Sequence, residues 1–408
     1  MPAIQGLRGT GDWGTDERPK NFREFILWRD PNGDSPLQAL MARARSESVD
    51  DPEFAWWEEE LMPVRLQVTA AVTTTQTTII IDTGDALDLV AGDVLMVEAE
   101  NETFATEFVE VASVTNTTTF VVVRARAGTS GATIADDSWL TKIGNVFEEG
   151  TTSPQASTRN PLKKLNYCQI FKTAYRITET AKRTRARTGP ALQNDKRRKA
   201  FDHSVALEYA YMFGKPYEDT TGAKPKRYTG GLLHFLADAD ANENDADHCV
   251  FIWTTTATED DILNNAYKMW DHRTGGRGGG NERIGLWGNG AINTLNKIIK
   301  NSNSTQIRYD GTIKFFGMEL TRVTLPQGTF YLRSHPLMNK HGRYTNSGFF
   351  INPGTLVDRP LRKTKSMSNI QANDADEEKG QWLTESGLEV QHAKTMAYWG
   401  AFNTASAT

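Results

Sequence analysis

Between residues 65 and 145 the sequence carries short β-type runs about ten residues apart, and this pattern restricts the fold more than any other feature. Threonine occupies six of the ten positions 69–78. Gly and Asn residues separate the runs, and β-branched strands with turn residues at this spacing predict a small antiparallel barrel or sandwich. The flanking segments 56–66 and 139–147 also look extended, so a module of about residues 67–145 is predicted to interrupt a longer element. The predicted strands of the module are Thr77–Ile81, Asp93–Glu98, Glu107–Val114 and Thr117–Arg124.

The remainder of the chain mixes helical and strand patterns. The clearest helix is predicted over 190–214, because Thr188, Gly189 and Pro190 form a start signal and Gly214 a stop signal. Its predicted apolar stripe consists of Phe201, Val205, Tyr209 and Met212, backed by Leu192 and Phe213.

Two more helices are predicted, over 259–273 with Thr258 as cap and over 290–300 with Asn289 as cap. Strand patterns follow at 312–323, 329–333, 348–352 and 387–398. Residues 1–50 are predicted to form a loose arm with two short amphipathic helices, over 21–29 and 36–45. The order of these elements indicates an α+β fold.

The composition is that of a globular protein. The 408 residues are 38% hydrophobic and 24% charged, which allows two to three domains with real cores. No apolar run approaches the length of a membrane span, and no secretory signal precedes the arm. The two cysteines, Cys168 and Cys249, fit a protein made in a reducing cytoplasm, and Cys249 is expected to be a buried structural thiol.

Charge is distributed unevenly along the chain. Residues 1–60 carry 7 Lys and Arg against 13 Asp and Glu, and residues 61–150 carry 4 against 13, whereas residues 151–230 carry 17 against 6. Such separation suits a protein that presents different faces to different partners. The basic residues of the central segment are therefore a candidate surface that faces DNA or a neighbouring subunit. An equally open alternative is that they simply pair with the acidic segments. The candidates are Arg183, Arg185, Arg187, Lys196, Arg197, Arg198 and Lys199.

No catalytic, cofactor or metal site is predicted. The seven histidines form no metal-binding spacing, and His203 on the basic helix is expected to be solvated or interfacial. The glycine-rich run 275–280 lacks the Lys-Ser/Thr ending of a phosphate loop and is interpreted as a flexible connection. A hydrolase using His272 and Glu282 beside this run stays open as a remote alternative. A secreted β-rich adhesin or carbohydrate-binding protein is another, which the missing signal and the basic helix disfavour.

Several segments, in their order, resemble the Hong Kong 97-type major capsid proteins of tailed bacteriophages. The segment 54–60, FAWWEEE, is similar to the family's entry into its extended loop, and segments 147–150, 166–171 and 177–180 are similar to the return path. Residues 207–210 resemble the spine helix, and 230–232 the segment that leaves it. Within the family, GDVL at 92–95 and VRARAGT at 123–129 resemble the subgroup related to the major capsid protein of podovirus SU-ten, in which a β-module interrupts the extended loop.

The resemblance implies a Hong Kong 97-type fold and a shell protein that is not an enzyme and needs no cofactor. It implies self-assembly into hexamers and pentamers of an icosahedral shell around double-stranded DNA, bound without sequence specificity. Further implied partners are a portal and possible scaffolding or decoration proteins, but no membrane; assembly would occur in the bacterial host cytoplasm. The implied segments are an arm at 1–50, an extended loop at 51–180 interrupted by the module at about 67–145, the spine helix and start of the peripheral domain at 181–230, an axial-type α/β domain at 231–375, and a returning peripheral strand with the C-terminus at 376–408.

Overall fold

A computed structural model of the chain describes most of its residues. The chain forms two compact units, one made of residues 56–164 and the other of residues 1–55 and 165–408. The α+β class is confirmed by their helices and sheets. The described residues are 37, 45–59, 65–82, 84–98, 106–185, 189–241, 249–254, 256–272, 280–301, 308–315 and 318–402.

The unit of residues 56–164 is a β-barrel, as the β-branched runs predicted. Its six-stranded sheet closes on itself, because β3 continues into an antiparallel bridge between Val68 and Ile81, and the Thr69 N–H donates to the Ile80 carbonyl at 3.0 Å. Closure removes the exposed sheet edges. The strand order is β3 (Arg65–Gln67), β8 (Trp139–Asn145), β5 (Asp93–Val97), β6 (Glu107–Val114), β7 (Thr119–Arg126) and β4 (Thr78–Ile80), with a 3-10 turn η1 at Gly84–Asp88.

Alternation fixes which side chains fill the barrel. Along β6, Glu107, Val109 and Val111 are buried while Phe108 and Glu110 are half-buried, the period-two pattern of a strand with one interior face. The other barrel strands add branched side chains, and fifteen buried hydrophobic residues form one core. This module therefore has its own hydrophobic core.

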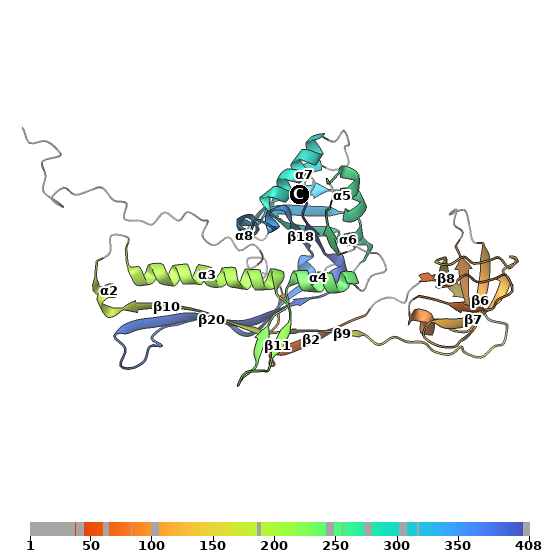
Figure 1. Ribbon diagram of the computed structural model, residues 1–408, viewed down its shortest axis with the longest axis horizontal. Helices are drawn as coiled ribbons and strands as arrows, with labels where there is room; N and C mark the ends of the chain where they lie inside the picture. The colour runs from red at the N-terminus through yellow and green to blue at the C-terminus, as the bar shows by residue number, and fades with distance from the viewer. Residues whose placement is uncertain are drawn as a thin grey trace, which may run out of the picture. The chain divides into compact units, whose positions relative to one another are not determined.

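In the second unit, helix α3 (Ala191–Phe213) lies along a four-stranded sheet (Figure 1). The strand order is β1 (Arg45–Ser46), β19 (Leu356–Met367), β20 (Glu377–Val390) and β10 (Gln169–Thr178), antiparallel except for the parallel pair β1–β19. Strands far apart in sequence thus form this sheet. Short helices and hairpins accompany it: α2 (Glu179–Arg183), α4 (Leu232–Ala241), β11 (Tyr217–Asp219) and β12 (Lys226–Tyr228).

Residues 50–66 and 140–180, the two sides of the implied extended loop, pair with each other over only part of their length, through β3 with β8 and β2 with β9. Strand β2 (Glu53–Glu58) pairs only with β9 (Leu162–Tyr167), whereas β8 belongs to the barrel and β10 pairs with β20 over all ten of its residues. The apolar face of β10 is covered by α3, so this long-range pairing buries more surface than a bare two-stranded ribbon would.

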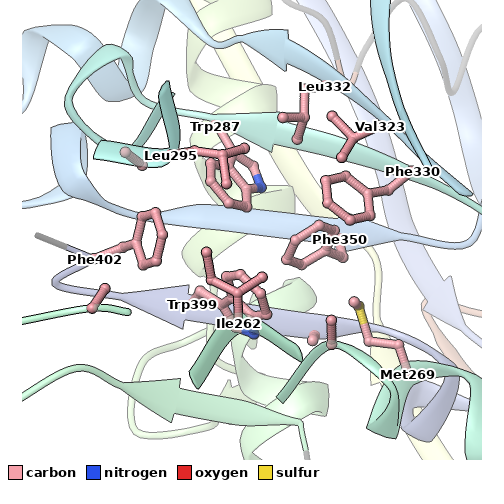
Figure 2. Packing of buried hydrophobic residues seen from close by; sticks show 14 of the residues in the cluster. Ile262, Met269, Trp287, Leu295, Val323, Phe330, Leu332, Phe350, Trp399 and Phe402 are labelled. Atoms are coloured by element: carbon pink, nitrogen blue, oxygen red, sulfur yellow. The ribbon is translucent and has the colours of Figure 1, made fainter. Parts of the chain in front are cut away.

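A seven-stranded mixed sheet forms the rest of this unit, and aromatic side chains fill its core (Figure 2). Trp287 and Trp399 lie 5.7 Å apart between ring centroids, and each contacts Phe350. The strand order is β13 (Val250–Ile252), β21 (Ala397–Gly400), β18 (Gly348–Ile351), β14 (Glu282–Trp287), β17 (Thr329–Ser334), β16 (Met318–Thr324) and β15 (Arg308–Phe315). The accompanying helices are α5 (Glu259–Ala266), α6 (Lys268–Asp271), α7 (Asn289–Asn301) and α8 (Pro336–Lys340), with 3-10 turns η2 (Tyr344–Asn346), η3 (Pro353–Thr355) and η4 (Ala393–Thr395).

Three predicted elements differ from those observed here. The predicted helix 259–273 begins with the expected capping box of Thr258 and Asp261 but is divided at Tyr267 into α5 and α6. The predicted strand 312–323 is a hairpin, β15 and β16. The last predicted strand, 387–398, comprises the end of β20, the turn η4 and the start of β21, which joins the seven-stranded sheet.

Candidate functional site

The basic residues selected from the sequence lie on α2, on the segment after it and on the first turns of α3. Arg183, Arg185, Arg197 and Arg198 are exposed, and Lys196 and Lys199 are half-buried. Arg187 lies outside the described residues. The structure therefore places most of this cluster in contact with solvent.

Some of these charges have local partners. Lys199 Nζ lies 2.8 Å from Asp202 Oδ2, and Arg183 Nε lies 3.8 Å from Glu179 Oε2. Lys196 Nζ stands 6.0 Å from the centre of the Trp382 ring, within reach of a cation–π contact. These pairs are solvent-accessible and of low energy, so they leave the cluster able to exchange partners.

Helix α3 is attached to its sheet by polar groups rather than by the predicted stripe. Phe201, Val205 and Tyr209 are only half-buried, whereas Met212 is fully buried, as predicted. The buried positions are His203, Leu207, Glu208, Tyr211 and Met212. The stripe is displaced because side chains of the sheet supply hydrogen-bond partners that make burial of polar residues favourable.

The expectation that His203 is solvated or interfacial is wrong. The side chain is 2% exposed, with Nδ1 3.1 Å from Thr173 Oγ1 on β10 and Nε2 2.7 Å from Thr384 Oγ1 on β20. Burial lowers the pKa of His203, which favours the neutral ring. His203 is thus a structural link between α3 and two strands.

About two turns further along α3, Tyr211 makes a second link between the helix and the sheet. Its hydroxyl lies 2.6 Å from Ser386 Oγ and donates to Asp358 Oδ1 at 3.1 Å. Burial raises the pKa of both Tyr211 and Asp358. At the other end of the sheet, Trp382 Nε1 donates to the carbonyl of Lys196. These contacts attach α3 to the four-stranded sheet at three places along its length.

A second set of basic residues, which the sequence analysis did not select, lies on the sheet. The strand register places Lys172 of β10 and Lys365 of β19 opposite the same residue, Leu383 of β20, and both lysines are exposed. Nearby, Arg176 Nη2 lies 2.5 Å from Glu377 Oε2, and Arg362 Nε donates to Glu385 Oε2 at 2.5 Å. The available signal was the run Arg362-Lys363-Thr364-Lys365, but its position depends on a pairing over more than 180 residues.

Large apolar side chains are exposed on the ribbon of β2 and β9 and at the start of β10. Trp57 is 64% exposed, Leu162 56% and Ile170 49%. Surfaces of this kind mark interaction sites more often than isolated apolar residues do.

Nothing described here assembles a catalytic constellation around His272 and Glu282. His272 is half-buried and Glu282 is exposed, and Glu282 accepts a hydrogen bond from the Tyr331 hydroxyl at 2.9 Å. The glycine-rich segment 273–279 lies outside the described residues. Within the described ranges, no three His, Cys, Asp or Glu side chains are placed to hold a metal ion. In the same ranges no helix combines the length and apolarity that a bilayer span requires.

Cys249 is buried, as expected, and Cys168 is buried as well. Burial and nearby carboxylates raise the pKa of Cys168 to about 12, and its Sγ donates to the Arg359 carbonyl at 3.4 Å. A thiol held in this way is chemically inert.

Comparison with known proteins identifies the family of this chain. The sequence matches the family described as SU10 major capsid protein over residues 7–400. The major capsid protein of Pseudomonas phage PaMx41 is 26% identical over 360 residues, covering 86% of this chain and 80% of that protein.

Solved structures similar to this chain include one from Mycobacterium phage Bobi. It has a TM-score of 0.47 at 7% identity, and the match covers 94% of this chain and 95% of that chain. Another, the capsid of the Myoviridae phage XM1, has a TM-score of 0.45 at 8% identity and covers 93% and 96%. The family assignment rests on the sequence match over nearly the full length, with the expected order of an inserted β-module, a long helix and an α/β domain. The chain therefore belongs to the SU10 major capsid protein family of tailed bacteriophages.

Proposed function

We propose that copies of this major capsid protein form hexamers and pentamers of an icosahedral shell and that the exposed basic end of α3 contacts the packaged double-stranded DNA. The single observation that supports the DNA contact is the exposure of Arg197 and Arg198 on α3, a helix anchored by buried contacts, together with the exposure of Arg183 and Arg185 at the end of α2 and just after it. Arginines there would bind phosphates. Phosphate contacts carry no sequence information, which suits a shell that must hold any genome.

The experiment replaces Arg197, Arg198 and Lys199 by glutamine. Empty shells should assemble normally, while filled shells should lose stability and release DNA at lower salt, because each lost phosphate contact reduces the electrostatic part of the binding. The salt concentration of DNA release from purified filled particles is the measurement.

A matched control removes the same charge from the sheet, by changing Lys172, Lys363 and Lys365 to glutamine. These lysines are also exposed but lie outside the proposed DNA-facing cluster. If both triple variants shift DNA release equally, net charge rather than the α3 surface determines it. If the α3 variant fails to form shells at all, the cluster is a contact between subunits and the DNA assignment is wrong.

Contacts between subunits are proposed to include the ribbon of β2 and β9. A two-stranded ribbon is marginal in water on its own, and this one exposes Trp57 and Leu162. A neighbouring subunit is the proposed cover. Hydrogen exchange in the ribbon should then be slow in shells and fast in unassembled protein; equal exchange would argue against docking.

The β-module is proposed to face outward, because residues 61–150 carry a net charge of −9 and an inward surface of that sign would repel DNA. Assembly in the host cytoplasm, a portal and scaffolding or decoration proteins complete the proposal, as does a purely structural, non-enzymatic role. We retain the proposed segments of the chain: arm 1–50, extended loop 51–180 with module 67–145, spine helix 181–230, axial-type domain 231–375 and returning segment 376–408.

A further inference from the structure

A carboxylate on the buried face of α3 links three separate parts of the chain. The Glu208 side chain is completely buried. Its Oε1 accepts a hydrogen bond from the backbone N–H of Leu37 at 2.8 Å and lies 2.8 Å from His335 Nε2. Leu37 and His335 are themselves 0% exposed. The carboxylate therefore lies where Leu37, the helix α3 and the start of α8 meet.

The roles of the two histidine nitrogens follow from their neighbours. His335 is the N-cap of α8, and its Nδ1 accepts from the Met338 N–H at 3.4 Å. A ring nitrogen that accepts carries no proton, so the proton of the neutral ring lies on Nε2 and points at Glu208. Glu208 Oε1 thus acts as acceptor for both neighbours.

The backbone N–H of Leu37 is a buried hydrogen-bond donor and therefore requires an acceptor. The residue is fully buried, so water cannot serve as the acceptor. A buried backbone N–H without an acceptor costs free energy. The Glu208 carboxylate satisfies this donor with a charge-assisted hydrogen bond.

We propose that Glu208 is the docking residue of the N-terminal arm, residues 1–50, and that it holds the arm at Leu37 by accepting the backbone N–H of that residue. The same oxygen receives His335 Nε2–H, so arm docking is coupled to the contact between α3 and α8. A nearby contact, from the Tyr209 hydroxyl to the Leu337 carbonyl at 3.2 Å, joins the same two helices and is independent of the carboxylate. The α3–α8 contact therefore persists without Glu208, whereas the arm loses its hydrogen bond to α3.

The test is hydrogen exchange, read by mass spectrometry, on the full-length Glu208→Ala variant. Peptides that contain Leu37 should exchange at least tenfold faster than in the wild type, equivalent to about 1.4 kcal/mol. The matched control is His203→Ala, which removes another buried polar side chain of α3 that contacts Thr173 and Thr384 instead of the arm. This control should leave Leu37 peptides unchanged.

Two results would overturn the proposal. Glu208→Ala could leave Leu37 peptides as slow as in the wild type, or His203→Ala could accelerate them equally, which would make the effect a general loosening of α3. Should Glu208→Ala fail to fold, Glu208→Met serves instead, since it keeps the length of the side chain and removes both acceptor oxygens. Faster exchange at Leu37 with unchanged exchange at 209–212 then supports arm docking, and unchanged exchange at Leu37 refutes it.

Discussion

The ion pair inside one end of the β-barrel is the interaction whose removal should cost the module most. The side chains of Glu107 and Arg124 are 0% and 8% exposed. The carboxylate accepts from Arg124 Nε at 2.9 Å, from Arg124 Nη2 at 2.5 Å, and from the backbone N–H groups of Ala125 and Ala132 at 2.7 and 3.0 Å. Arg124 Nη1 also donates to two carbonyls of the loop 73–76, at 2.9 Å each. The pair thus joins strands β6 and β7 to two loops, the one at 73–76 and the one that contains Ala132.

Changing Glu107 to glutamine should lower the free energy of unfolding of the module by about 3–5 kcal/mol. Breaking a buried pair leaves the Arg124 charge without a counterion. In addition, the amide NH₂ group of the glutamine would face N–H donors that hydrogen-bonded to a carboxylate oxygen in the wild type. For a domain of about 80 residues, a loss of about 3 kcal/mol lowers the melting temperature by roughly 12–24 °C.

The assay is thermal unfolding of the full-length protein, followed by circular dichroism together with hydrogen exchange in β6 and β7. The control is Glu98→Gln, which breaks the pair between Glu98 and Arg65 in the same barrel, where the side chains are 26% and 54% exposed. Exposed pairs contribute less than about 1 kcal/mol. Equal, small shifts in both variants would refute the argument that burial makes the Glu107 pair important.

The same pair gives the module an acid-sensitive stability. Burial alone would raise the pKa of Glu107, but hydrogen bonds from Arg124, Ala132 and Ala125 outweigh it and bring the pKa below its ordinary value of 4.5. A pKa that is lower in the folded state stabilises the fold above pH 4.5, and the contribution is lost as the pH falls through the folded pKa. The wild-type melting temperature should therefore fall more steeply than that of Glu107→Gln below about pH 4.5.

Three other substitutions or treatments have outcomes that the packing determines. Gly348→Ala should lower the melting temperature, with a destabilisation of about 1–3 kcal/mol, because the added Cβ would lie 2.3 Å from Trp287 Cδ1. The control is Gly280→Ala, where no atom lies within 4 Å of the added Cβ, so the free energy of unfolding should change by less than about 0.5 kcal/mol. Cys168, with its pKa raised to about 12, should resist a thiol reagent at pH 8 in the native protein and react after denaturation. Arg283→Met should destabilise the seven-stranded sheet by about 3 kcal/mol, measured by denaturant unfolding, because this buried guanidinium donates to four backbone carbonyls.

Local patterns in the sequence predicted local structure well. The β-branched runs located β4, β5 and β6 to within a residue at each end, and β7 with a displacement of two residues. The Gly and Pro signals located α3 within one residue. These elements depend on neighbours in sequence, where propensity and turn chemistry act.

Burial and long-range pairing could not be predicted in the same way. The buried strand β20 contains Glu385 and Glu389, 5% and 1% exposed, whose partners are Arg362 and Arg359 on β19. Read locally, such a sequence indicates an exposed strand. The charges are buried only because another strand, selected by the fold of the whole unit, brings arginines opposite them. The same reason explains why the buried face of α3 was misplaced.

Part of the basic surface could be predicted from the sequence, and part of it could not. The position of Lys196, Arg197, Arg198 and Lys199 on α3 followed from the helix signal, and the exposure of Arg197 and Arg198 followed from their charge. The helix α2, which carries Arg183, was not predicted. The sheet lysines were missed, because Lys172 and Lys365 become neighbours across Leu383 only through the pairing of β10, β20 and β19.

The order of pairing also limits when the larger unit can form. Strand β20 lies between β19 and β10, and β21 lies between β13 and β18, so residues 377–400 supply an inner strand to both sheets. All strands of the barrel, by contrast, come from residues 65–145 and pair within that segment. Local pairing closes loops at less entropic cost and folds faster than pairing across 200 residues. The barrel is therefore expected to form first. The four- and seven-stranded sheets can be completed only after β20 and β21 are available. A subunit consequently cannot present a complete α3 surface, or a complete sheet to a neighbour, before β20 and β21 are in place.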